Sequence, residues 1–464
     1  MGERILVVGA DAAGMSAAHQ CLRSAALAAR EVDVVVLERT CDTSYSACGI
    51  PYLVAGMVNS PDDLSARTPD KHRAMGVDLR LGTTAVGIDL DKRTVDALAS
   101  DGTASTIGFD QLVLATGAEP IIPDWARDRS GDLLPGVAAV KTLDDARYWL
   151  EVFADSGEMR SNRRRGVVIG GGYIGVEAAE ALQQRGFDTH LVTRSRVMST
   201  FDSTMSARIE EAMIDDGVTV MTNTVVELVE IAHDGTKILH TAGGRTIEAD
   251  VVMIGTGVRP ASTLGADAGL PIGDHLGYLT DDRQQLGEGI WAAGDCCEAY
   301  DRLRGKNAFL PLGTHANKQG RICGFNLVGG DRRFAGVLGT AITRYHSASA
   351  HIEIARTGLS TTQALEVGYQ PVSLTTEGGT ASGYMAERSS IATHAIADKG
   401  TRKLLGVQIV GGTAAGKRID TAAAALWGDM AVDDLAEMDL SYAPPFATVW
   451  EAIQLAARRL ADAL

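Results

Sequence analysis

Long apolar runs, basic runs and a secretion signal are all missing from this 464-residue sequence. No apolar run reaches the ~18 residues that a membrane-spanning helix needs. Charges at positions 3 and 4 interrupt the N-terminus, where a signal peptide would need an apolar stretch. A net charge of -16 with no offsetting basic run disfavours nucleic-acid binding. We therefore expect a cytoplasmic protein with neither a membrane nor a nucleic-acid partner.

Cysteine is scarce as well, and its spacing is irregular. The six cysteines fit neither a dense disulfide framework nor the paired C-x-x-C pattern of a zinc site. The ten histidines lack the i, i+4 spacing of a metal-binding helix. We therefore expect no metal site. Cys296 and Cys297 are predicted to be buried small residues, and three further cysteines lack ligand-type partners in the sequence: Cys21, Cys41 and Cys323.

One unit of strand, glycine turn and helix, by contrast, occurs twice. RILVVGADAAGMSAAHQCL (4–22) is echoed by GVVIGGGYIGVEAAEALQQRG (166–186), and each copy is typical of the start of a dinucleotide-binding βαβ unit. A buried strand followed by a glycine turn and a proline is also repeated, at 109–120 and 248–260. GIWAAGDCCEAY (289–300) completes the first module only after the second has closed.

The repeat predicts an α/β protein with two nested Rossmann-like dinucleotide-binding domains. Residues 1–118 and 259–335 would form the first domain, and residues 119–258 the second, inserted into the first. Residues 336–464 carry strand-like stretches such as LLGVQIVGG (404–412) and helical ones such as RIDTAAAALWGDM (418–430). These residues have no nucleotide motif, so we expect a third, α+β domain.

The first glycine turn, GADAAG, keeps Gly9 and Gly14 but has Asp11 in place of the middle glycine. Its next strand, in VDVVVLERT, ends at Glu38. A carboxylate at this distance binds the ribose diol of a dinucleotide. The first module is therefore predicted to bind a dinucleotide that has no 2′-phosphate.

The second turn, GGGYIG, has the full G-x-G-x-x-G spacing, at Gly170, Gly172 and Gly175. In the following strand, THLVTRSR, Thr193 takes the place of the ribose-binding acid and is followed by Arg194 and Arg196. Arginines can bind a 2′-phosphate that a carboxylate would repel. The second module is therefore predicted to prefer NADPH over NADH, the alternative being that both arginines belong to a solvated loop.

With its nested modules and the ATG, GTG and AAGD turns, the whole chain resembles the pyridine nucleotide-disulfide oxidoreductase family of flavoproteins. The resemblance implies that the first module binds FAD and the second NAD(P)H. It implies an aromatic gate at Tyr173 and a nicotinamide neighbour at Glu177. It also implies that the helix after LPLG (310–313) begins at the flavin. The implied FAD residues are Gly9, Asp11, Ala12, Gly14, Glu38, Arg39, Val86, Thr116, Gly117, Asp295 and Thr314. The implied NAD(P)H residues are Gly170, Gly172, Tyr173, Ile174, Gly175, Glu177, Arg194, Arg196 and Gly257.

A single redox cysteine follows from the same resemblance. Dithiol members carry C-x4-C, whereas here six residues separate Cys41 from Cys48, and only Cys48 is at the family position. SYSACGIPYLVAG is similar to the single-cysteine branch, which contains coenzyme A-disulfide reductases, NADH oxidases, NADH peroxidases and persulfide reductases. Pro51 is a favoured first helical residue, so Cys48 would precede a helix N-terminus, whose field lowers a thiol pKa from about 8.5.

Further absences narrow the choice within the family. Oxidases and peroxidases place a histidine in the first glycine turn, where this chain has Ala12, and the C-terminus has neither the His-Glu pair of dithiol reductases nor a terminal cysteine pair. SYAPPF instead matches the coenzyme A-disulfide reductase segment whose tyrosine, here Tyr442, reaches the partner subunit's site. Tyr384 resembles a second such residue, and an interface role is the alternative for both tyrosines. Ala47 replaces the asparagine common in those reductases.

The sequence thus predicts a homodimeric, FAD-dependent NAD(P)H oxidoreductase. Cys48, helped by Tyr442 and Tyr384, would reduce a low-molecular-weight disulfide or persulfide, with coenzyme A disulfide as the leading substrate. The alternatives are an NAD(P)H oxidase that uses O2 and a flavoprotein redox sensor or electron-transfer protein. The residues expected to contact the substrate are Arg23, Ser44, Arg67 and Lys71.

Overall fold

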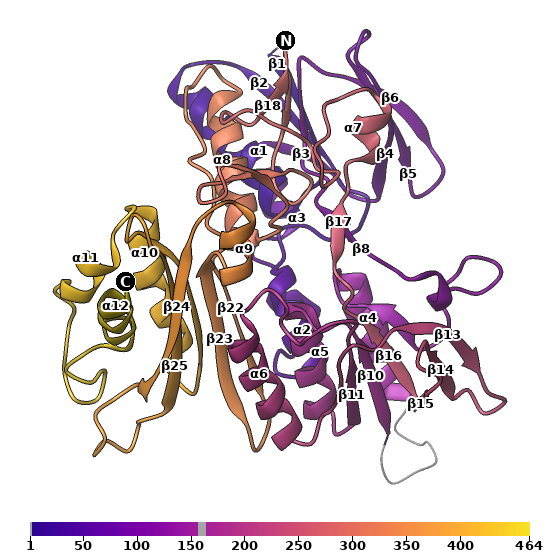
Figure 1. Ribbon diagram of the computed structural model, residues 1–464. Helices are drawn as coiled ribbons and strands as arrows, with labels where there is room; N and C mark the ends of the chain where they lie inside the picture. Colours follow the sequence, from indigo (N-terminus) through magenta and orange to yellow (C-terminus); the bar gives the residue numbers. More distant parts are fainter. Residues whose placement is uncertain (1, 156–163) are drawn as a thin grey trace. The chain divides into compact units, whose positions relative to one another are not determined.

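The computed structural model describes residues 2–155 and 164–464, which form two compact units (Figure 1). The first unit comprises Met1–Ile50, Asn59–Ile121 and Val258–Val337, and the second comprises Pro51–Val58, Ile122–Gly257 and Leu338–Leu464. Residues Ile122–Gly257 of the second unit are thus inserted between two segments of the first unit. The predicted boundaries at 118, 258 and 335 stay a prediction. Among the described helices, none has the length and apolarity that a bilayer crossing requires.

A six-stranded sheet, in the order β18-β19-β7-β1-β2-β3, forms the centre of the first unit. All strands are parallel except β18. Val8 is in register with both Leu37 and Leu114, so three strands end at one edge, where a parallel sheet binds its ligand. The strands are β1 (Glu3–Val8), β2 (Val32–Leu37), β3 (Val77–Arg80), β7 (Gln111–Leu114), β18 (Gln285–Gly287) and β19 (Ile290–Ala292).

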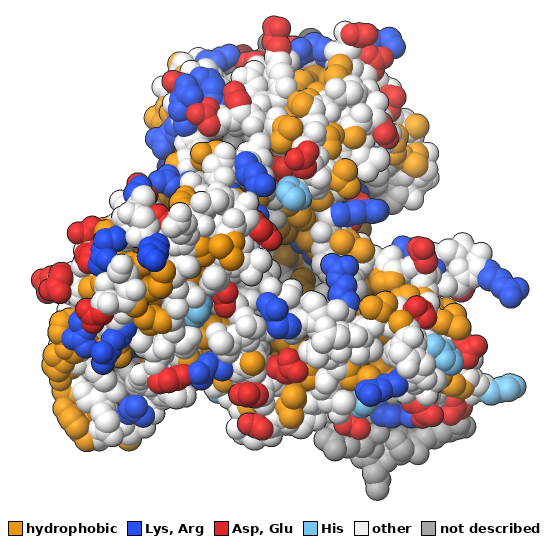
Figure 2. Space-filling view, viewed as in Figure 1, with side chains coloured by type: hydrophobic (Ala, Val, Ile, Leu, Met, Phe, Trp, Pro, Cys, Tyr) orange, Lys and Arg blue, Asp and Glu red, His pale blue; other side chains and the backbone are white. Residues whose placement is uncertain are grey.

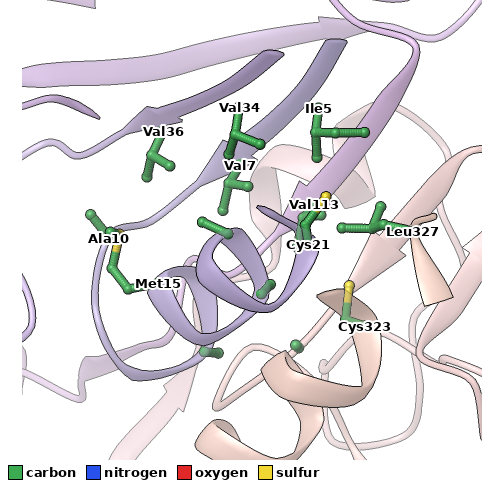
Figure 3. Packing of buried hydrophobic residues seen from close by; sticks show 14 of the residues in the cluster. Ile5, Val7, Ala10, Met15, Cys21, Val34, Val36, Val113, Cys323 and Leu327 are labelled. Carbon is green, nitrogen blue, oxygen red and sulfur yellow. The ribbon is translucent and has the colours of Figure 1, made fainter. Parts of the chain in front are cut away.

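Two helices, α1 (Ala12–Leu27) and α8 (Gly313–Asn326), pack against each other in this unit. Their contact is close because glycines of α8 face the backbone of α1. An added Cβ would lie 2.1 Å from Ala13 O at Gly320 and 2.2 Å from Ala17 O at Gly324. The buried core beneath includes strand valines together with Cys21 and Cys323 (Figure 3).

Smaller elements complete the first unit. A separate three-stranded antiparallel sheet shares a hydrophobic core with the main sheet and contacts the short helix α7. The elements are η1 (Ala47–Gly49), η2 (Pro61–Leu64), α3 (Pro69–Ala74), β4 (Thr83–Asp89), β5 (Thr94–Ala99), β6 (Ala104–Gly108), β8 (Ala118–Pro120), β17 (Val258–Pro260), α7 (Thr263–Asp267), β20 (Ala299–Asp301) and β21 (Lys306–Ala308).

The second unit repeats the βαβ arrangement in a parallel sheet of order β12-β11-β10-β16-β9. The strands are β9 (Val137–Ala139), β10 (Arg165–Ile169), β11 (Asp188–Val192), β12 (Thr219–Met221) and β16 (Val251–Ile254), and the helices are α2 (Ile50–Ala55), α4 (Leu143–Asp155), α5 (Tyr173–Gln184) and α6 (Ser203–Asp215). A small antiparallel sheet contacts η3 (Asp124–Ala126) through its strand β13. Its strands are β13 (Val226–Ile231), β14 (Lys237–Thr241) and β15 (Thr246–Ala249).

The C-terminal part of this unit is built on an antiparallel sheet of order β22-β23-β26-β25-β24. All eight residues of β26 are buried, because α10 and α6 also pack against this strand. Helix α12 lies against β24 and β25 (Figure 1). The elements are β22 (Ala341–His346), β23 (His351–Gly358), α9 (Thr361–Glu366), β24 (Pro371–Gly379), β25 (Ser390–Asp398), β26 (Leu404–Gly411), α10 (Ile419–Trp427), α11 (Val432–Glu437) and α12 (Ala452–Ala463).

Candidate functional site

Cys48 lies in the 3₁₀ turn η1, which continues directly into helix α2, and its side chain is exposed. The sequence predicted that Pro51 opens the helix, but α2 begins one residue earlier, at Ile50. Proline is tolerated at the second position because amides of the first turn need no helical partner. The thiol therefore stands just before a helix N-terminus.

Hydrogen bonds attach the segment before Cys48 to the first glycine turn. Thr43 Oγ1 and Ser44 N both donate to Ala10 O, at 2.6 and 3.2 Å. On the other side, Gly49 packs so closely that an added Cβ would lie 2.4 Å from Leu64 Cδ2. Contacts on both sides therefore determine the path of the backbone around the thiol.

Both glycines of the first turn are required by backbone packing. Gly9 has a φ of 104°, and a Cβ there would lie 2.2 Å from Ala115 O. A Cβ at Gly14 would lie 1.9 Å from Gly9 O. The chain turns tightly from β1 through Asp11, the N-cap, into α1, where Ala12 is the first residue. Such a turn presents helix N-terminal amides to a pyrophosphate.

The carboxylate of Glu38 is held at the end of β2, beside this turn. Its Oε2 accepts a hydrogen bond from Ala10 N at 2.9 Å, and its Oε1 accepts from the backbone and hydroxyl of Thr40, both at 2.9 Å. Carboxylate oxygens retain lone pairs beyond these bonds, which a ribose diol can use. The turn and the acid together fit the adenosine half of FAD.

Four other predicted FAD residues belong to the same unit, three of them on connections and one, Thr314, in helix α8. Thr116 Oγ1 donates to Ala261 O at 2.5 Å. Gly117 has a φ of 73°, and in the described part of the chain no atom lies within 4 Å of a Cβ built there. Asp295 is the third residue after the end of β19, and Thr314 is exposed in the first turn of α8. The described first turn of α8 holds no acidic residue, so its positive end is available to an anion.

The last two FAD candidates differ from these in their surroundings. Arg39 Nη1 pairs with Glu119 Oε1 at 3.2 Å, and half of its side chain is exposed. Val86 is 57% exposed on β4, in the separate three-stranded sheet. The roles of both residues toward FAD stay predictions.

The second glycine turn is built like the first. Gly170 has a φ of 113°, and its Cβ would lie 2.2 Å from Gly255 O, while a Cβ at Gly175 would lie 1.9 Å from Gly170 O. Gly172 caps α5, and the described residues leave the space around its Cβ position open. The backbone is thus packed on one side and open on the other, which fits the pyrophosphate of NAD(P)H.

Thr193 and the two arginines lie where β11 ends. Thr193 is buried, while Arg194 and Arg196 are exposed. Arg196 Nη2 donates to Phe201 O at 3.2 Å, so part of this guanidinium is already engaged. Gly257 has a φ of 103° and open space around its Cβ position among the described residues. Arg194 is therefore the better candidate for contact with a 2′-phosphate.

The predicted gate and nicotinamide residues share one face of α5. Tyr173 is its first residue, followed by Ile174, and burial raises the pKa of Tyr173 to about 12. Its hydroxyl is buried and has no hydrogen-bond partner among the described residues. Glu177 lies one turn later and accepts a hydrogen bond from Thr343 Oγ1 at 2.7 Å. An unpartnered buried hydroxyl beside a carboxyl fits a polar ligand group such as a nicotinamide amide.

Sequence reasoning missed the residues that surround Glu177. Thr343 is 166 residues away on β22, and only the packing of α5 on β22 brings the two together. Burial and the charges of Glu177 and Glu180 raise the pKa of Tyr52, which follows Cys48 by four residues in the chain. Arg344 lies over the Tyr52 ring at 5.2 Å. Nothing in the spacing of these residues signals the cluster.

Two of the basic residues predicted to contact substrate, Arg23 and Arg67, lie near a buried histidine pair. His19 Nε2 and His72 Nδ1 are 2.7 Å apart, on α1 and α3. Burial and the charge of Arg67 lower the pKa of both histidines, and Arg23 acts likewise on His19. Arg23 and Arg67 therefore lie near the same place. Lys71, the third predicted cation, is exposed on α3. The sequence gave no indication of the histidine pair.

The two candidate tyrosines lie on loops that contact each other. Ser382 N donates to Pro444 O at 2.9 Å, and Arg418 Nη2 donates to both Thr380 O and Phe446 O at 2.7 Å. Tyr384 is 77% exposed and Tyr442 47%. Hydrophobic side chains are exposed along the outer edge of this C-terminal part (Figure 2), including Phe446, Val449 and Trp450.

The remaining cysteines divide by burial. Cys296 and Cys297 are buried as predicted, with their Sγ atoms 3.9 Å apart. Cys21 and Cys323 are buried too, and burial raises the thiol pKa of Cys21 to about 12. Cys41 is exposed, like Cys48. Burial also raises the thiol pKa of Cys297 and Cys323, and a thiol of raised pKa is a poor nucleophile. Burial opposes ionisation of Cys296 as well, but hydrogen bonds, that with Cys297 first among them, lower its pKa.

Comparison with known proteins agrees with this geometry. Residues 3–320 match the family described as Pyridine nucleotide-disulphide oxidoreductase, and residues 347–453 match its dimerisation domain. The chain is 33% identical over 467 residues to the NAD(P)H coenzyme A polysulfide/persulfide reductase of Pyrococcus horikoshii, with 99% of each sequence covered.

Solved structures resemble the whole chain. The NAD-dependent persulfide reductase from A. fulgidus matches with a TM-score of 0.91 and 30% identity, over 99% of this chain and 83% of that one. The water-forming NADH oxidase from Lactobacillus brevis bound to NADH, and its engineered NADPH oxidase form bound to NADPH, both match with a TM-score of 0.90 and 26% identity, over 99% of this chain and 98% of theirs.

These matches confirm the predicted fold class, in which two nested Rossmann-like domains precede an α+β dimerisation domain. They also confirm the predicted cofactors, FAD and NAD(P)H, which the two glycine turns fit. The chain belongs to the pyridine nucleotide-disulphide oxidoreductase family.

Proposed function

We propose that this oxidoreductase is a homodimer that uses NADPH to reduce a low-molecular-weight disulfide or persulfide through Cys48. The observation that carries the proposal is the position of Cys48. Its exposed thiol precedes the N-terminus of α2, on a segment bonded to the first glycine turn. A helix N-terminus favours the thiolate, which is the form that attacks sulfur.

FAD, held by the first glycine turn and Glu38, would supply the two electrons that sulfur accepts, with NADPH as their source. The Cys48 thiolate attacks one sulfur of RSSR′, the S–S bond breaks, and R′S⁻ leaves as Cys48–S–S–R forms. Two electrons then cleave this mixed disulfide, which restores the Cys48 thiolate and releases RS⁻. With one proton taken up, NADPH and RSSR′ become NADP⁺, RSH and R′SH.

Coenzyme A disulfide or persulfide is the substrate that we propose. Arg23 and Arg67 gather near the His19–His72 pair, and Lys71 is exposed on the same helix as His72. In a protein of net charge -16, such a group of cations suits a phosphorylated thiol. The Pyrococcus relative, a coenzyme A polysulfide/persulfide reductase, supports this substrate class.

NADPH is proposed over NADH because of the residues that end β11. In the engineered Lactobacillus NADPH oxidase, an Asp-Ala-Met triplet is replaced by Ala-Arg-Ser. This chain has an uncharged residue followed by Arg194 and Ser195 at the end of β11. The same order of residues therefore accompanies NADPH use in the engineered protein.

Substitution of Cys48 tests the mechanism, and Cys41, which is equally exposed, supplies the matched control. We expect Cys48→Ser to stay folded, yellow and FAD-bound but to lose disulfide-dependent NADPH oxidation, and Cys41→Ser to keep it. Mass spectrometry of the wild type incubated with coenzyme A disulfide should find the adduct on Cys48. Full disulfide reduction by Cys48→Ser would refute the covalent mechanism.

Reduction of O2 is the second candidate function, supported by the likeness to the water-forming NADH oxidase. The family's oxidases resemble one another in having a histidine in the first glycine turn. This chain has Ala12 there, which argues against O2 reduction. Oxygen-electrode traces during NADPH oxidation distinguish the two functions. NADPH-dependent O2 uptake that coenzyme A disulfide does not displace would favour the oxidase.

A further inference from the structure

The surroundings of the Glu177 carboxyl favour neither its neutral nor its ionised form strongly near neutral pH. It is enclosed between α5 and β22, and the Thr343 hydroxyl donates to it at 2.7 Å. Burial raises the pKa of Glu177 to about 7, while the Thr343 hydrogen bond opposes the rise. Small changes nearby can therefore switch this carboxyl between neutral and ionised near neutral pH.

The other charged or titratable groups around it come from four elements. Glu180, one turn along α5, accepts a hydrogen bond from His346 N at 2.8 Å and lies 3.6 Å from Arg344 Nε. The charge of Glu177 disfavours ionisation of Glu180, and Arg344 favours it. The remaining groups are Tyr52 on α2, Tyr173 on α5 and Arg356 on β23, which acts on Tyr173.

We propose that Glu177 matches its charge to that of the nicotinamide ring, staying neutral beside the reduced ring and ionising beside the oxidised, cationic ring. The proposal rests on the proposed function, in which NADPH is the hydride donor, and on the predicted place of Tyr173 and Glu177 at the nicotinamide. Hydride loss makes the ring cationic, so the proton on the Glu177 carboxyl leaves to solvent. It returns when NADP⁺ dissociates, so the proton balance of the whole reaction is unchanged.

Linkage gives this exchange a measurable consequence. A cation that favours the ionised carboxyl must bind more tightly where that carboxyl is already ionised. NADP⁺ affinity should therefore rise between pH 6 and pH 8, whereas a nucleotide with a neutral ring gains nothing. The Tyr173 hydroxyl, buried and without a partner among the described residues, is available to either ring form.

Calorimetric titration of the FAD-loaded enzyme tests the inference. The probes are NADP⁺ and tetrahydro-NADPH, whose neutral ring donates no hydride. We expect the ratio of their affinities to shift about tenfold toward NADP⁺ from pH 6 to pH 8, the equivalent of one pKa unit. NADP⁺ binding near pH 7 should also release protons, seen as a dependence of the heat on the buffer.

Substitutions test whether Glu177 causes the pH dependence and the proton release. Glu177→Gln should remove both the pH dependence and the proton release. Thr343→Val should move the transition to higher pH, because the bond that favours the carboxylate is lost, while Thr343→Ser retains the hydroxyl and the wild-type transition.

An affinity ratio that is independent of pH in the wild type, or unchanged pH dependence in Glu177→Gln, would overturn the inference while leaving the proposed function intact. The Arg194→Ala variant tests the proposed function separately from the inference. Both probes carry a 2′-phosphate, so both should bind this variant with equally reduced affinity. Unchanged binding of both probes to Arg194→Ala would instead contradict the nucleotide assignment on which the inference rests.

Discussion

The buried carboxyl of Glu180 on α5 shows how a single residue links pH to stability. Glu180 is 1% exposed, and burial raises its pKa to about 7 in the folded protein. An unfolded glutamate titrates near 4.3. The folded state therefore binds more protons than the unfolded state between these values, so Glu180 makes folding less favourable as pH rises through this window.

Glu180→Gln should remove this penalty. The amide oxygen can still accept the hydrogen bond from His346 N, and its charge does not change with pH. Relative to wild type, the variant should gain about 1–3 kcal/mol of unfolding free energy at pH 8 and little at pH 4.5. Thermal or denaturant unfolding at both pH values measures this. An equal difference at both would show that the carboxyl does not titrate in this range.

Residues differed in how far the sequence could predict them. Gly9, Gly14 and Cys48 belong to local motifs whose spacing is set by one turn of backbone, so a single stretch of sequence identifies them. Thr343 and the His19–His72 pair depend on contacts between elements far apart in the chain. Hydroxyl and imidazole groups occur throughout the sequence, so nothing local marks these as members of a site.

At the scale of elements, the packing of α1 on α8 depends on glycine. Both helices begin at positions that the sequence assigned to FAD, and Gly320 lets their backbones approach. The sequence predicted each helix from its glycine turn or the LPLG stretch. It could not predict their mutual contact, because small residues in a helix have no partner specified by sequence.

Gly320→Ala should therefore destabilise the protein by about 1–3 kcal/mol and weaken FAD binding, because its Cβ would lie 2.1 Å from Ala13 O. Gly313→Ala, in the same helix, is the control for stability alone, since the described residues leave the space around its Cβ position open. Melting temperature and the flavin-to-protein absorbance ratio report the two effects. Equal behaviour of both variants would mean that α1 and α8 can separate without cost.

At the scale of the molecule, the C-terminal part exposes apolar surface that a monomer seldom leaves uncovered. Phe446 is 74% exposed and Val449 71%, next to the two tyrosine loops. The match of residues 347–453 to a dimerisation domain supports a second copy as the cover. The sequence indicated a dimer from two features: the third domain has no nucleotide motif, and SYAPPF resembles a segment that reaches a partner subunit.

Complementation between two inactive variants tests whether Tyr442 acts across such a dimer. A tyrosine hydroxyl, with a reference pKa of about 10, can protonate a departing thiolate of similar basicity. Tyr442→Phe should therefore slow disulfide turnover while NADPH still reduces the flavin at a near-normal rate. Mixing Tyr442→Phe with Cys48→Ser and allowing subunits to exchange should restore part of the activity, because one of the two sites in each mixed dimer then holds both groups. Differently tagged subunits, recovered together, establish that exchange has occurred. A monomer in solution, or exchange without recovered activity, would assign Tyr442 to packing alone.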